Sequence, residues 1–337
     1  MTFKLPFFVA EISANHCGNL KTAKKLIYSA KKYGADAVKI QTYKPDTMTV
    51  NSRKNIFKVK KGVWKNYYLW DLYQKAHTPY KWHSELFNYA KKLKMLIFST
   101  PFDASAVDLL QKLNCPIYKV ASFEITDLPL IKRIAKTKKP MIISTGMANL
   151  SEIGEAVRIA RKNGCTNLTL LYCVSNYPSR ISDFNLNNIK ILKKKFKCKV
   201  GLSDHSKDNI VAISAVAAGA ELIEKHIGLN KNSKGLDMEF SICGKDIYKF
   251  KSDIVTAKKL IGEPKFFRNP SEKKNKTYRR SIFVIKDIEK NEKFTYQNIK
   301  ILRPAFGILP KYYEKIIGKK SKVKLKKNTP LKLKNYD

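Results

Sequence analysis

Residues 200–227, VGLSDHSKDNIVAISAVAAGAELIEKHI, contain two short apolar stretches separated by an apolar segment with helical spacing. We predict strands at 200–203 and 222–227 and a helix at 210–218, because the short stretches are bounded by Gly or polar residues. Strands that are apolar on both faces are typical of parallel sheets covered by helices. Both strands carry polar residues near their ends, Ser203-Asp204-His205 and Glu224-Lys225-His226. The stretch therefore predicts a βαβ unit with chemistry at one edge.

The same alternation extends over most of the chain. We predict further strands at 7–12, 37–42, 95–100, 117–122, 141–145 and 168–173, and further helices at 21–33, 81–92, 104–113, 128–135, 151–162, 186–196 and 247–261. About eight β–α units in about 260 residues indicate an α/β fold of the TIM (β/α)8 barrel type. A doubly wound open sheet is the alternative, but no GxGxxG motif follows any of these strands.

Composition changes after the last predicted helix and indicate a second domain. We predict a barrel domain at 1–262, a charged linker at 263–279, and a small β-rich domain at 280–337 that is too short to bury much core alone. Residues 44–79 are aromatic-rich and too long for an ordinary barrel loop. Long loops of this kind are usually functional or form interfaces.

The chain has 67 Lys and Arg against 27 Asp and Glu, a formal net charge of +40. Such a charge makes nucleic acid, membrane surfaces and acidic small molecules candidate partners. The lysines are scattered, however, and no nucleic-acid recognition module is present, so nucleic-acid binding is only a remote alternative. Six cysteines without a CxxC pair favour neither a zinc cluster nor a disulfide framework. With no signal peptide or apolar span of about 18 residues, we expect a cytoplasmic protein without membrane contact.

Three lysines fall within predicted strands, where an unpaired ammonium is costly to bury. Together with the neighbouring hydroxyl groups they favour an anionic ligand such as a phosphate or carboxylate. The alternative is a structural ion-pair network of Lys39, Lys119 and Lys225 with Glu11, Glu124 and Glu224.

His205 and His226 lie near the ends of adjacent predicted strands. Two converging imidazoles with oxygens nearby can hold a divalent cation such as Mn, Co or Zn, although a single His is more often a hydrogen-bonded core residue. A Schiff-base aldolase acting through Lys119 and a catalytically inactive scaffold barrel are further alternatives. The inactive barrel is disfavoured, because burying so many polar groups without a ligand stabilises nothing.

Several motifs resemble the sialic acid synthase family: AEISANHCGN, GADAVKIQTY, FSTPFD, YKVASFEITDLPL, ISTGMA, GLSDHS and IEKHI. Beyond the linker, RRSIFVIKDI and ILRPAFG resemble the family's C-terminal antifreeze-like (SAF) domain. The resemblance covers essentially the whole chain in order. Within the family, EISANH, DLYQKAHTPYKWHSELF and ASFEITDLPL look most like pseudaminic acid synthases.

The resemblance implies a transferase that joins C3 of phosphoenolpyruvate to the aldehyde of an open-chain aminosugar and releases phosphate. The implied sugar is 2,4-diacetamido-2,4,6-trideoxy-L-altrose, which gives pseudaminic acid; N-acetylneuraminate and legionaminate synthases are the alternatives. The implied cofactor is a divalent metal held by His205 and His226, with Mn2+ first and Mg2+ or Co2+ as alternatives. It would polarise the aldehyde as a Lewis acid.

The resemblance also assigns roles to individual positions. The implied catalytic residues are Glu11, Glu124, His205 and His226; those for phosphoenolpyruvate are Lys39, Thr100, Lys119, Ser122, Ser175 and Ser203; and those for the sugar are Glu124, Tyr177, Asp237 and Arg303. Phe123, Tyr177 and residues 44–79 are expected to distinguish between sugars.

Arg303 matches an arginine that reaches the barrel of the other subunit, which implies a domain-swapped homodimer.

Two other positions, Ala305 and Ser175, depart from what the family or part of it usually has. Ala305 stands where the family usually has Gly, so this loop has less access to positive φ. Neuraminate synthases have Asn where Ser175 stands, which agrees with the pseudaminic interpretation.

Overall fold

The computed structural model describes residues 5–335, which divide into two compact units, the first ending at Gly262 and the second beginning at Glu263. In the first unit eight parallel strands pair in sequence order, and pairing of the first with the eighth closes the sheet. The strands are β1 (Phe7–Glu11), β2 (Ala37–Thr42), β3 (Leu96–Pro101), β4 (Tyr118–Val120), β5 (Met141–Ser144), β6 (Leu168–Cys173), β7 (Lys199–Asp204) and β8 (Leu222–Gly228). The predicted TIM-type barrel is confirmed.

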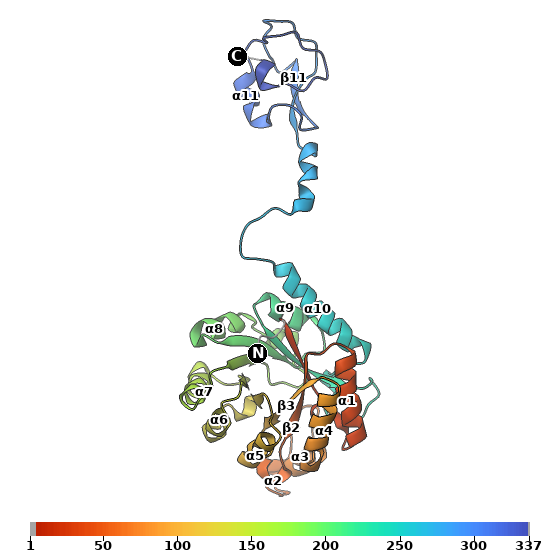
Figure 1. Cartoon of the computed structure of the whole chain (residues 1–337), viewed down its shortest axis with the longest axis vertical. Coiled ribbons are helices and arrows are strands. Elements are labelled where there is room, and N and C mark those ends of the chain that lie inside the picture. Colours follow the sequence, from red (N-terminus) through yellow and green to blue (C-terminus); the bar gives the residue numbers. More distant parts are fainter. Residues whose placement is uncertain (1–4, 336–337) are drawn as a thin grey trace. The chain divides into compact units, whose positions relative to one another are not determined.

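Helices enclose the strands of this unit (Figure 1). They are α1 (Leu20–Lys32), α4 (Tyr80–Lys92), α5 (Ala104–Lys112), α6 (Leu128–Ala135), α7 (Leu150–Lys162), α8 (Asn187–Phe196), α9 (Ile210–Ala217) and α10 (Lys245–Ile261). Several begin at a side-chain cap of the kind that satisfies free backbone N–H groups. Asn149, for example, accepts from the N–H groups of Ser151 and Glu152, and Glu152 accepts from Asn149 in return.

Nearly every position of the strands is buried, because side chains fill the barrel interior and helices cover its outside. Leu222–Gly228, for instance, is buried at every position. A Cβ at Gly201 of β7 would lie 2.1 Å from the carbonyl oxygen of Leu222, so only glycine allows β7 and β8 to approach here. The parallel register brings the carboxyl ends of all eight strands to one end of the barrel.

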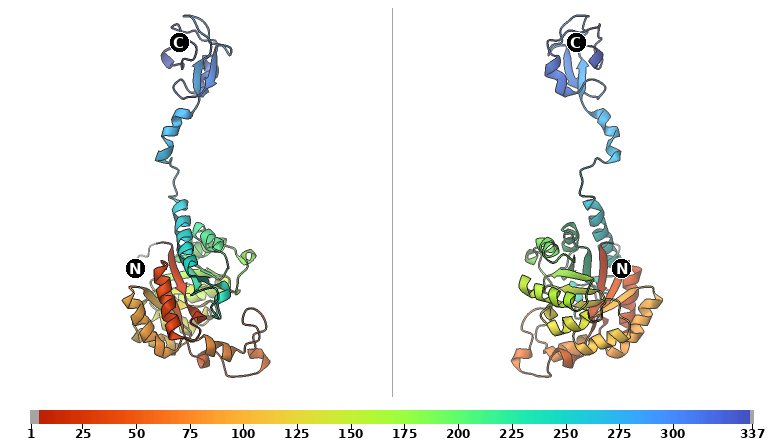
Figure 2. Two further views of the ribbon diagram at one scale, coloured as in Figure 1. Left: turned by 90° about the vertical axis from the view of Figure 1, so that its right-hand side faces the viewer. Right: turned by 60° about the vertical axis from the view of Figure 1, so that its left-hand side comes forward.

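The long segment between β2 and α4 contains two short helices, α2 (Pro45–Met48) and α3 (Leu69–Ala76). Figure 2 shows this segment, in orange, protruding beyond the barrel helices. After β8, a two-residue strand β9 (Ile242–Cys243) pairs with Ile227 and Gly228 before α10 begins. None of the helices described between residues 5 and 335 is long and apolar enough to cross a membrane.

The second unit begins with an exposed stretch, residues 263–280, that contains only short 3-10 turns. Its antiparallel sheet consists of β10 (Ser281–Val284) and β11 (Ile299–Leu302), followed by α11 (Tyr313–Ile316). A small apolar core includes Ile282, Phe294, Ile316 and Leu331. The loop after β11 passes so close to β10 that a Cβ at Gly307 would lie 2.5 Å from the carbonyl oxygen of Ile282.

Candidate active site

A cavity of about 400 Å³ opens at the carboxyl ends of the barrel strands. Its lining is drawn from β2, β4–β8, the loops that follow them, and the segment between β2 and α4. The predicted site residues that line it are Lys39, Lys119, Ser122, Glu124, Tyr177, Ser203, His205, His226 and Asp237. Residues as far apart in the sequence as Lys39 and Asp237 thus face one space.

Three predicted residues contact this lining without being part of it. Glu11 forms an ion pair with Lys39 at 2.5 Å, and Thr100 Oγ1 accepts a hydrogen bond from Lys39 Nζ at 3.0 Å. Ser175 Oγ donates to Ser122 Oγ at 2.9 Å. Arg303 belongs to the second unit, where it lies in the loop after β11 and is exposed.

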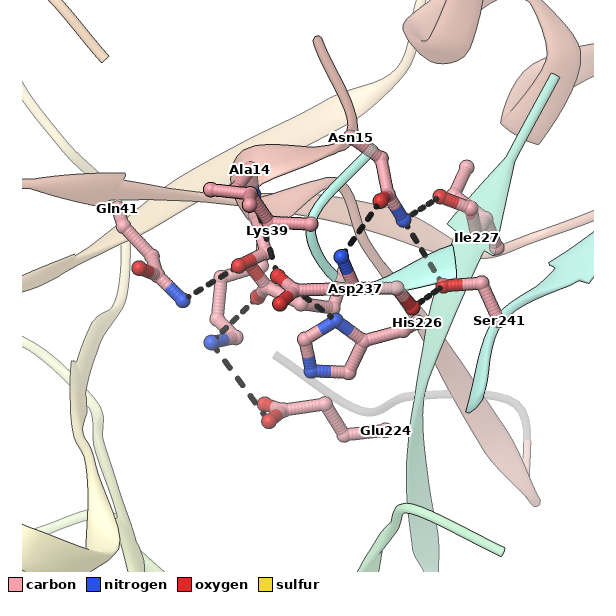
Figure 3. A network of polar contacts seen from close by, with 12 residues as sticks. Ala14, Asn15, Lys39, Gln41, Glu224, His226, Ile227, Asp237 and Ser241 are labelled. Carbon is pink, nitrogen blue, oxygen red and sulfur yellow. Dashed lines mark hydrogen bonds and ion pairs between the residues drawn. The ribbon is translucent and has the colours of Figure 1, made fainter. Parts of the chain in front are cut away.

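Lys39 is held between two carboxylates on the barrel floor. Its ammonium lies 2.5 Å from Glu11 and 3.6 Å from Glu224, and all three side chains are buried. Figure 3 shows Lys39 pointing toward Glu224. Burial opposes the charge on Lys39, but the two carboxylates outweigh it and raise the pKa of the lysine. Burial also opposes the charge on Glu224, and Lys39 and Lys119 together lower its pKa. Lys39 and Glu224 are therefore charged at neutral pH.

Lys119 differs from Lys39 in having no carboxylate partner. Its Nζ donates to Ser144 Oγ at 2.6 Å and to the carbonyl oxygen of Val120 at 2.8 Å, and the side chain is 1% exposed. No ion pair of Lys119 occurs among residues 5–335. Burial lowers the pKa of its ammonium. A buried ammonium that forms no ion pair and faces a cavity is suited to an anionic ligand.

The two predicted metal ligands come together in the same cavity. The ring centroids of His205 and His226 are 5.5 Å apart. Burial lowers the pKa of His205 to about 4 and that of His226 well below its ordinary value, so both rings are neutral. His205 Nδ1 contacts the carbonyl oxygen of Val174 at 3.2 Å, so this nitrogen carries the proton and Nε2 keeps a free lone pair.

These rings suit a divalent cation. His226 Nδ1 is buried, makes no hydrogen bond and lies 3.7 Å from Asp237 Oδ2. Neutral imidazoles with a free nitrogen and a nearby carboxylate are the ligands that Mn2+, Co2+ and Zn2+ accept. The described part of the chain contains no cluster of three or more His, Cys, Asp or Glu placed to bind a metal.

Asp237 is anchored to the first loop of the barrel (Figure 3). Its Oδ2 accepts from the N–H of Ala14 at 3.3 Å, and its own N–H donates to Asn15 Oδ1 at 3.2 Å. Asn15 Nδ2 in turn donates to the carbonyl oxygen of Ile227 at 2.9 Å and to Ser241 Oγ at 2.8 Å. Asn15 thus joins the loop after β1 to the loop after β8, which carries Asp237.

Two carboxyl groups are poised to exchange protons near neutral pH. Burial raises the pKa of Glu124 to about 7, although Lys119 partly opposes the shift. Burial also raises that of Glu11 to about 7, against the opposing charge of Lys39. One oxygen of Glu124 and Oε1 of Glu11 are buried without a hydrogen-bond partner, whereas Oε2 of Glu11 faces the Lys39 ammonium. A carboxyl group with a pKa near the working pH is a suitable general acid or base.

Aromatic rings form one wall of the cavity. Trp64, from the segment between β2 and α4, donates from Nε1 to the carbonyl oxygen of Leu236 at 3.0 Å. Its ring centroid lies 5.3 Å from that of Tyr177, which is 4.4 Å from His205. Phe240 packs 4.8 Å from His226 and 5.3 Å from Tyr177. The segment is therefore fastened to the loop that carries Asp237.

Gly146 allows two hydroxyl groups to meet beside the cavity. It has φ of +46°, and a Cβ there would lie 2.5 Å from Ser122 Cβ and 2.7 Å from Ser175 Oγ. Only glycine combines that conformation with so close an approach. The loop after β5 thus supports the hydrogen bond between Ser122 and Ser175.

Sequence reasoning missed several lining residues as parts of a site. It treated Glu224 only as a counter-charge and Ser144 only as a strand-end hydroxyl, although both line the cavity. It did not single out Tyr43, Phe240 or Cys173, which lie near predicted strand ends or loops without a distinguishing motif. The aromatic cluster of residues 44–79 was the available signal for Trp64 and Tyr73.

Family models match nearly the whole chain. Residues 26–266 match the model described as the NeuB family, and residues 279–336 match the model of the SAF domain. Among characterised relatives, the pseudaminic acid synthase of Helicobacter pylori is 46% identical over 330 residues, covering 97% of this chain and 96% of the relative. The pseudaminic acid synthase of Campylobacter jejuni serotype O:2 is 42% identical over 331 residues, covering 98% and 96%.

Solved structures agree with these matches. The N-acetylneuraminic acid synthetase of Leptospira borgpetersenii in complex with citrate is 32% identical, with a TM-score of 0.72, and covers 80% of this chain and 89% of that chain. A spore coat polysaccharide biosynthesis protein of Bacillus subtilis is 30% identical, with a TM-score of 0.66, and covers 98% and 94%.

Proposed function

Because this chain belongs to the NeuB family, we propose that it condenses phosphoenolpyruvate with the aldehyde of an open-chain acetamido sugar, forming a nonulosonic acid and releasing phosphate. The observation that carries this proposal is Lys119, a buried ammonium without a carboxylate partner in the same cavity as two neutral histidines. The relatives named pseudaminic acid synthases, at 42–46% identity over nearly the full chain, favour pseudaminic acid as the product. The sugar would then be 2,4-diacetamido-2,4,6-trideoxy-L-altrose.

Phosphoenolpyruvate would lie on the floor of the cavity, where the cations are. Lys119 and Lys39 would neutralise its phosphate and carboxylate, and Ser122 and Ser203 would donate hydrogen bonds to its oxygens. Thr100 and Ser175 hold Lys39 and Ser122 in place through the contacts described above. The floor groups thus bind and orient the nucleophilic carbon C3.

In the bond-forming step C3 of phosphoenolpyruvate attacks the sugar aldehyde. Glu124, protonated in part at neutral pH, would deliver the proton that the aldehyde oxygen gains. Water then adds at C2, and the proton that this water loses would pass by way of Lys39 to Glu11, its ion-pair partner behind the cavity lining. Cleavage of the bond between C2 and the phosphate oxygen then releases inorganic phosphate, which takes up the proton that the C2 hydroxyl loses as it becomes the ketone. Tyr177 and Asp237, which line the same cavity, would contact the sugar.

A divalent metal, Mn2+ in the first place and Mg2+ or Co2+ otherwise, would be held by His205 and His226. When bound, it would supply Lewis-acid polarisation of the aldehyde. The free ring nitrogen of His226 and its neighbour Asp237 support this assignment.

We further propose a cytoplasmic homodimer in which Arg303 of one subunit completes the site of the other. The six cysteines, none of them paired, agree with a reducing compartment. Two features agree with exchange of the SAF domain between subunits. Arg303 is exposed, and the exposed residues 263–279 before β10 can serve as a linker.

Phosphate release from phosphoenolpyruvate in the presence of Mn2+ tests the proposal. The arms are the diacetamido-trideoxy sugar, N-acetylmannosamine, a legionaminate precursor and no sugar. Release with the first sugar alone, lost on chelation and in His226→Ala, is expected. Release with another sugar would change the nonulosonic acid assigned as the product. Release with none of the sugars would overturn the proposed function.

A further inference from the structure

On the face of β7 and β8 opposite the cavity lies an ion pair that no step described above uses. Lys225 Nζ is 2.9 Å from Asp204 Oδ2, and both side chains are 0% exposed. The two residues are direct partners in the register of β7 with β8. Neither lines the cavity, whereas Ser203, Glu224 and the two histidines beside them do. The pair therefore cannot act by touching a ligand.

Its contacts surround the backbone of His205. Lys225 Nζ also donates to the carbonyl oxygen of Ser206, and the N–H of Ser206 donates to Asp204 Oδ1 at 2.9 Å. Asp204 precedes His205 and Ser206 follows it, so Lys225 fastens the chain on both sides of this histidine. On β8, the next residue after Lys225 is His226. One ammonium thus joins the backbone segments from which the two imidazoles project.

Other bonds complete the fixation of His205. Its carbonyl oxygen accepts from the N–H of Ser179 at 3.0 Å, and its Nδ1 is bound to the carbonyl oxygen of Val174. The ring is thus fixed against the loop after β6, and the Lys225 contacts fix the turn at the end of β7. A change in that turn would alter the separation of the two rings, which is 5.5 Å between centroids.

Stability alone does not account for such a pair. Taking two charges out of water costs about as much as their attraction returns, and apolar side chains of similar volume are often as stabilising or more so. Groups that orient metal ligands from behind, by contrast, strongly affect metal affinity.

We propose that Lys225 and Asp204 are positioning residues, which hold His205 at the separation from His226 that a shared divalent cation requires. The inference rests on the proposed function in that it takes the two histidines as metal ligands. It adds a pair of charged residues that act through the backbone of those ligands.

The test is the affinity for Mn2+ alone, measured on the full chain from the electron paramagnetic resonance signal of free Mn2+, without sugar or phosphoenolpyruvate. Asp204→Asn keeps the shape of the side chain and removes the charge. The double variant Asp204→Leu/Lys225→Met replaces both charges with apolar side chains. Thermal unfolding of each variant is recorded in parallel.

The chain offers a matched control at the opposite end of the barrel. Lys251 forms an ion pair with Asp36 and also donates to the carbonyl oxygen of Pro6, while Asp36 accepts from the N–H of Phe8. Asp36→Asn therefore disrupts the same kind of bridge far from the histidines. It should lower thermal stability without changing Mn2+ affinity.

We expect Asp204→Asn and the double variant to bind Mn2+ about tenfold or more weakly than the wild type. The double variant should do so while unfolding near the wild-type temperature, which separates positioning from stability. Either variant, if folded and within about twofold of the wild-type affinity, would overturn the inference. A wild-type protein that binds no Mn2+ would overturn the metal part of the proposed function and this inference together, and that result is visible before any variant is compared.

Discussion

Replacing Lys119 with Met should separate the protein's stability from its affinity for phosphoenolpyruvate. Lys119 is the buried ammonium that donates only to Ser144 Oγ and to the carbonyl oxygen of Val120. Met has a similar volume and no charge. The ligand-free protein loses two hydrogen bonds but is relieved of a buried charge, so the two effects oppose each other. We expect the unfolding temperature to change by no more than about 3 °C.

The affinity for phosphoenolpyruvate should fall, because in the complex the loss of the Lys119 charge is not offset by relief of an unpaired buried charge. A hydrogen bond to a charged group contributes about 1.5–3 kcal/mol, so the variant should bind phosphoenolpyruvate about 10- to 150-fold more weakly. Isothermal titration calorimetry with Mn2+ present measures the affinity. Differential scanning fluorimetry gives a second readout, because the stabilisation by ligand should shrink in proportion.

The control is Lys92→Met, which removes the same charge from an exposed position at the end of α4. Its affinity should equal that of the wild type at moderate salt, since exposed charges are screened. A folded Lys119→Met protein that binds phosphoenolpyruvate as tightly as the control would refute the assignment of Lys119 to the anion. Trapping of substrate on Lys119 by borohydride would instead support the aldolase alternative.

Three further predictions follow from the site. Burial raises the pKa of Glu124 from 4.5 to about 7, so its ionised carboxylate lowers the free energy of unfolding increasingly as pH rises between these values. In urea unfolding, the Glu124→Gln substitution should therefore raise the free energy of unfolding by about 2 kcal/mol more at pH 8 than at pH 5. An equal rise at both pH values would contradict the shift. Trp64→Phe removes the hydrogen bond to the Leu236 carbonyl, which contributes about 1 kcal/mol. In steady-state assays it should raise KM for the sugar about fivefold and leave the affinity for phosphoenolpyruvate unchanged. Equal losses for both substrates would argue against a role of Trp64 in binding the sugar. Mixing inactive Arg303→Ala and Glu124→Gln subunits should restore about a quarter of wild-type phosphate release if Arg303 acts across the dimer, and none if it acts within its own subunit.

The barrel could be predicted because each strand carries its own signal. Leu168–Cys173 and Ala37–Thr42 are apolar stretches with polar boundaries, and the structure reproduces both ranges as predicted. The polar ends of the strands were equally visible, because position at the end of a strand depends only on local sequence. The cavity residues His205, His226, Lys39 and Lys119 were found in this way.

Contacts between distant segments could not be predicted. The hydrogen bond from Trp64 to Leu236 joins residues 172 positions apart, and nothing in either local sequence indicates it. The same holds for the partner of each lysine. Sequence alone left open whether Lys225 meets a ligand or an acid, and the structure pairs it with Asp204, whereas Lys119 has no acid partner among the described residues. Pairing of buried charges depends on the register of adjacent strands.

The depth of the cavity has a consequence for the order of events in a catalytic cycle. The cations of the floor are almost fully buried, whereas Phe123, which lines the same cavity as the aromatic wall, is 60% exposed. A sugar seated against that wall would obstruct the path to Lys39 and Lys119. The two substrates should therefore add in a fixed sequence, phosphoenolpyruvate first, so that excess sugar slows turnover by occupying the empty enzyme.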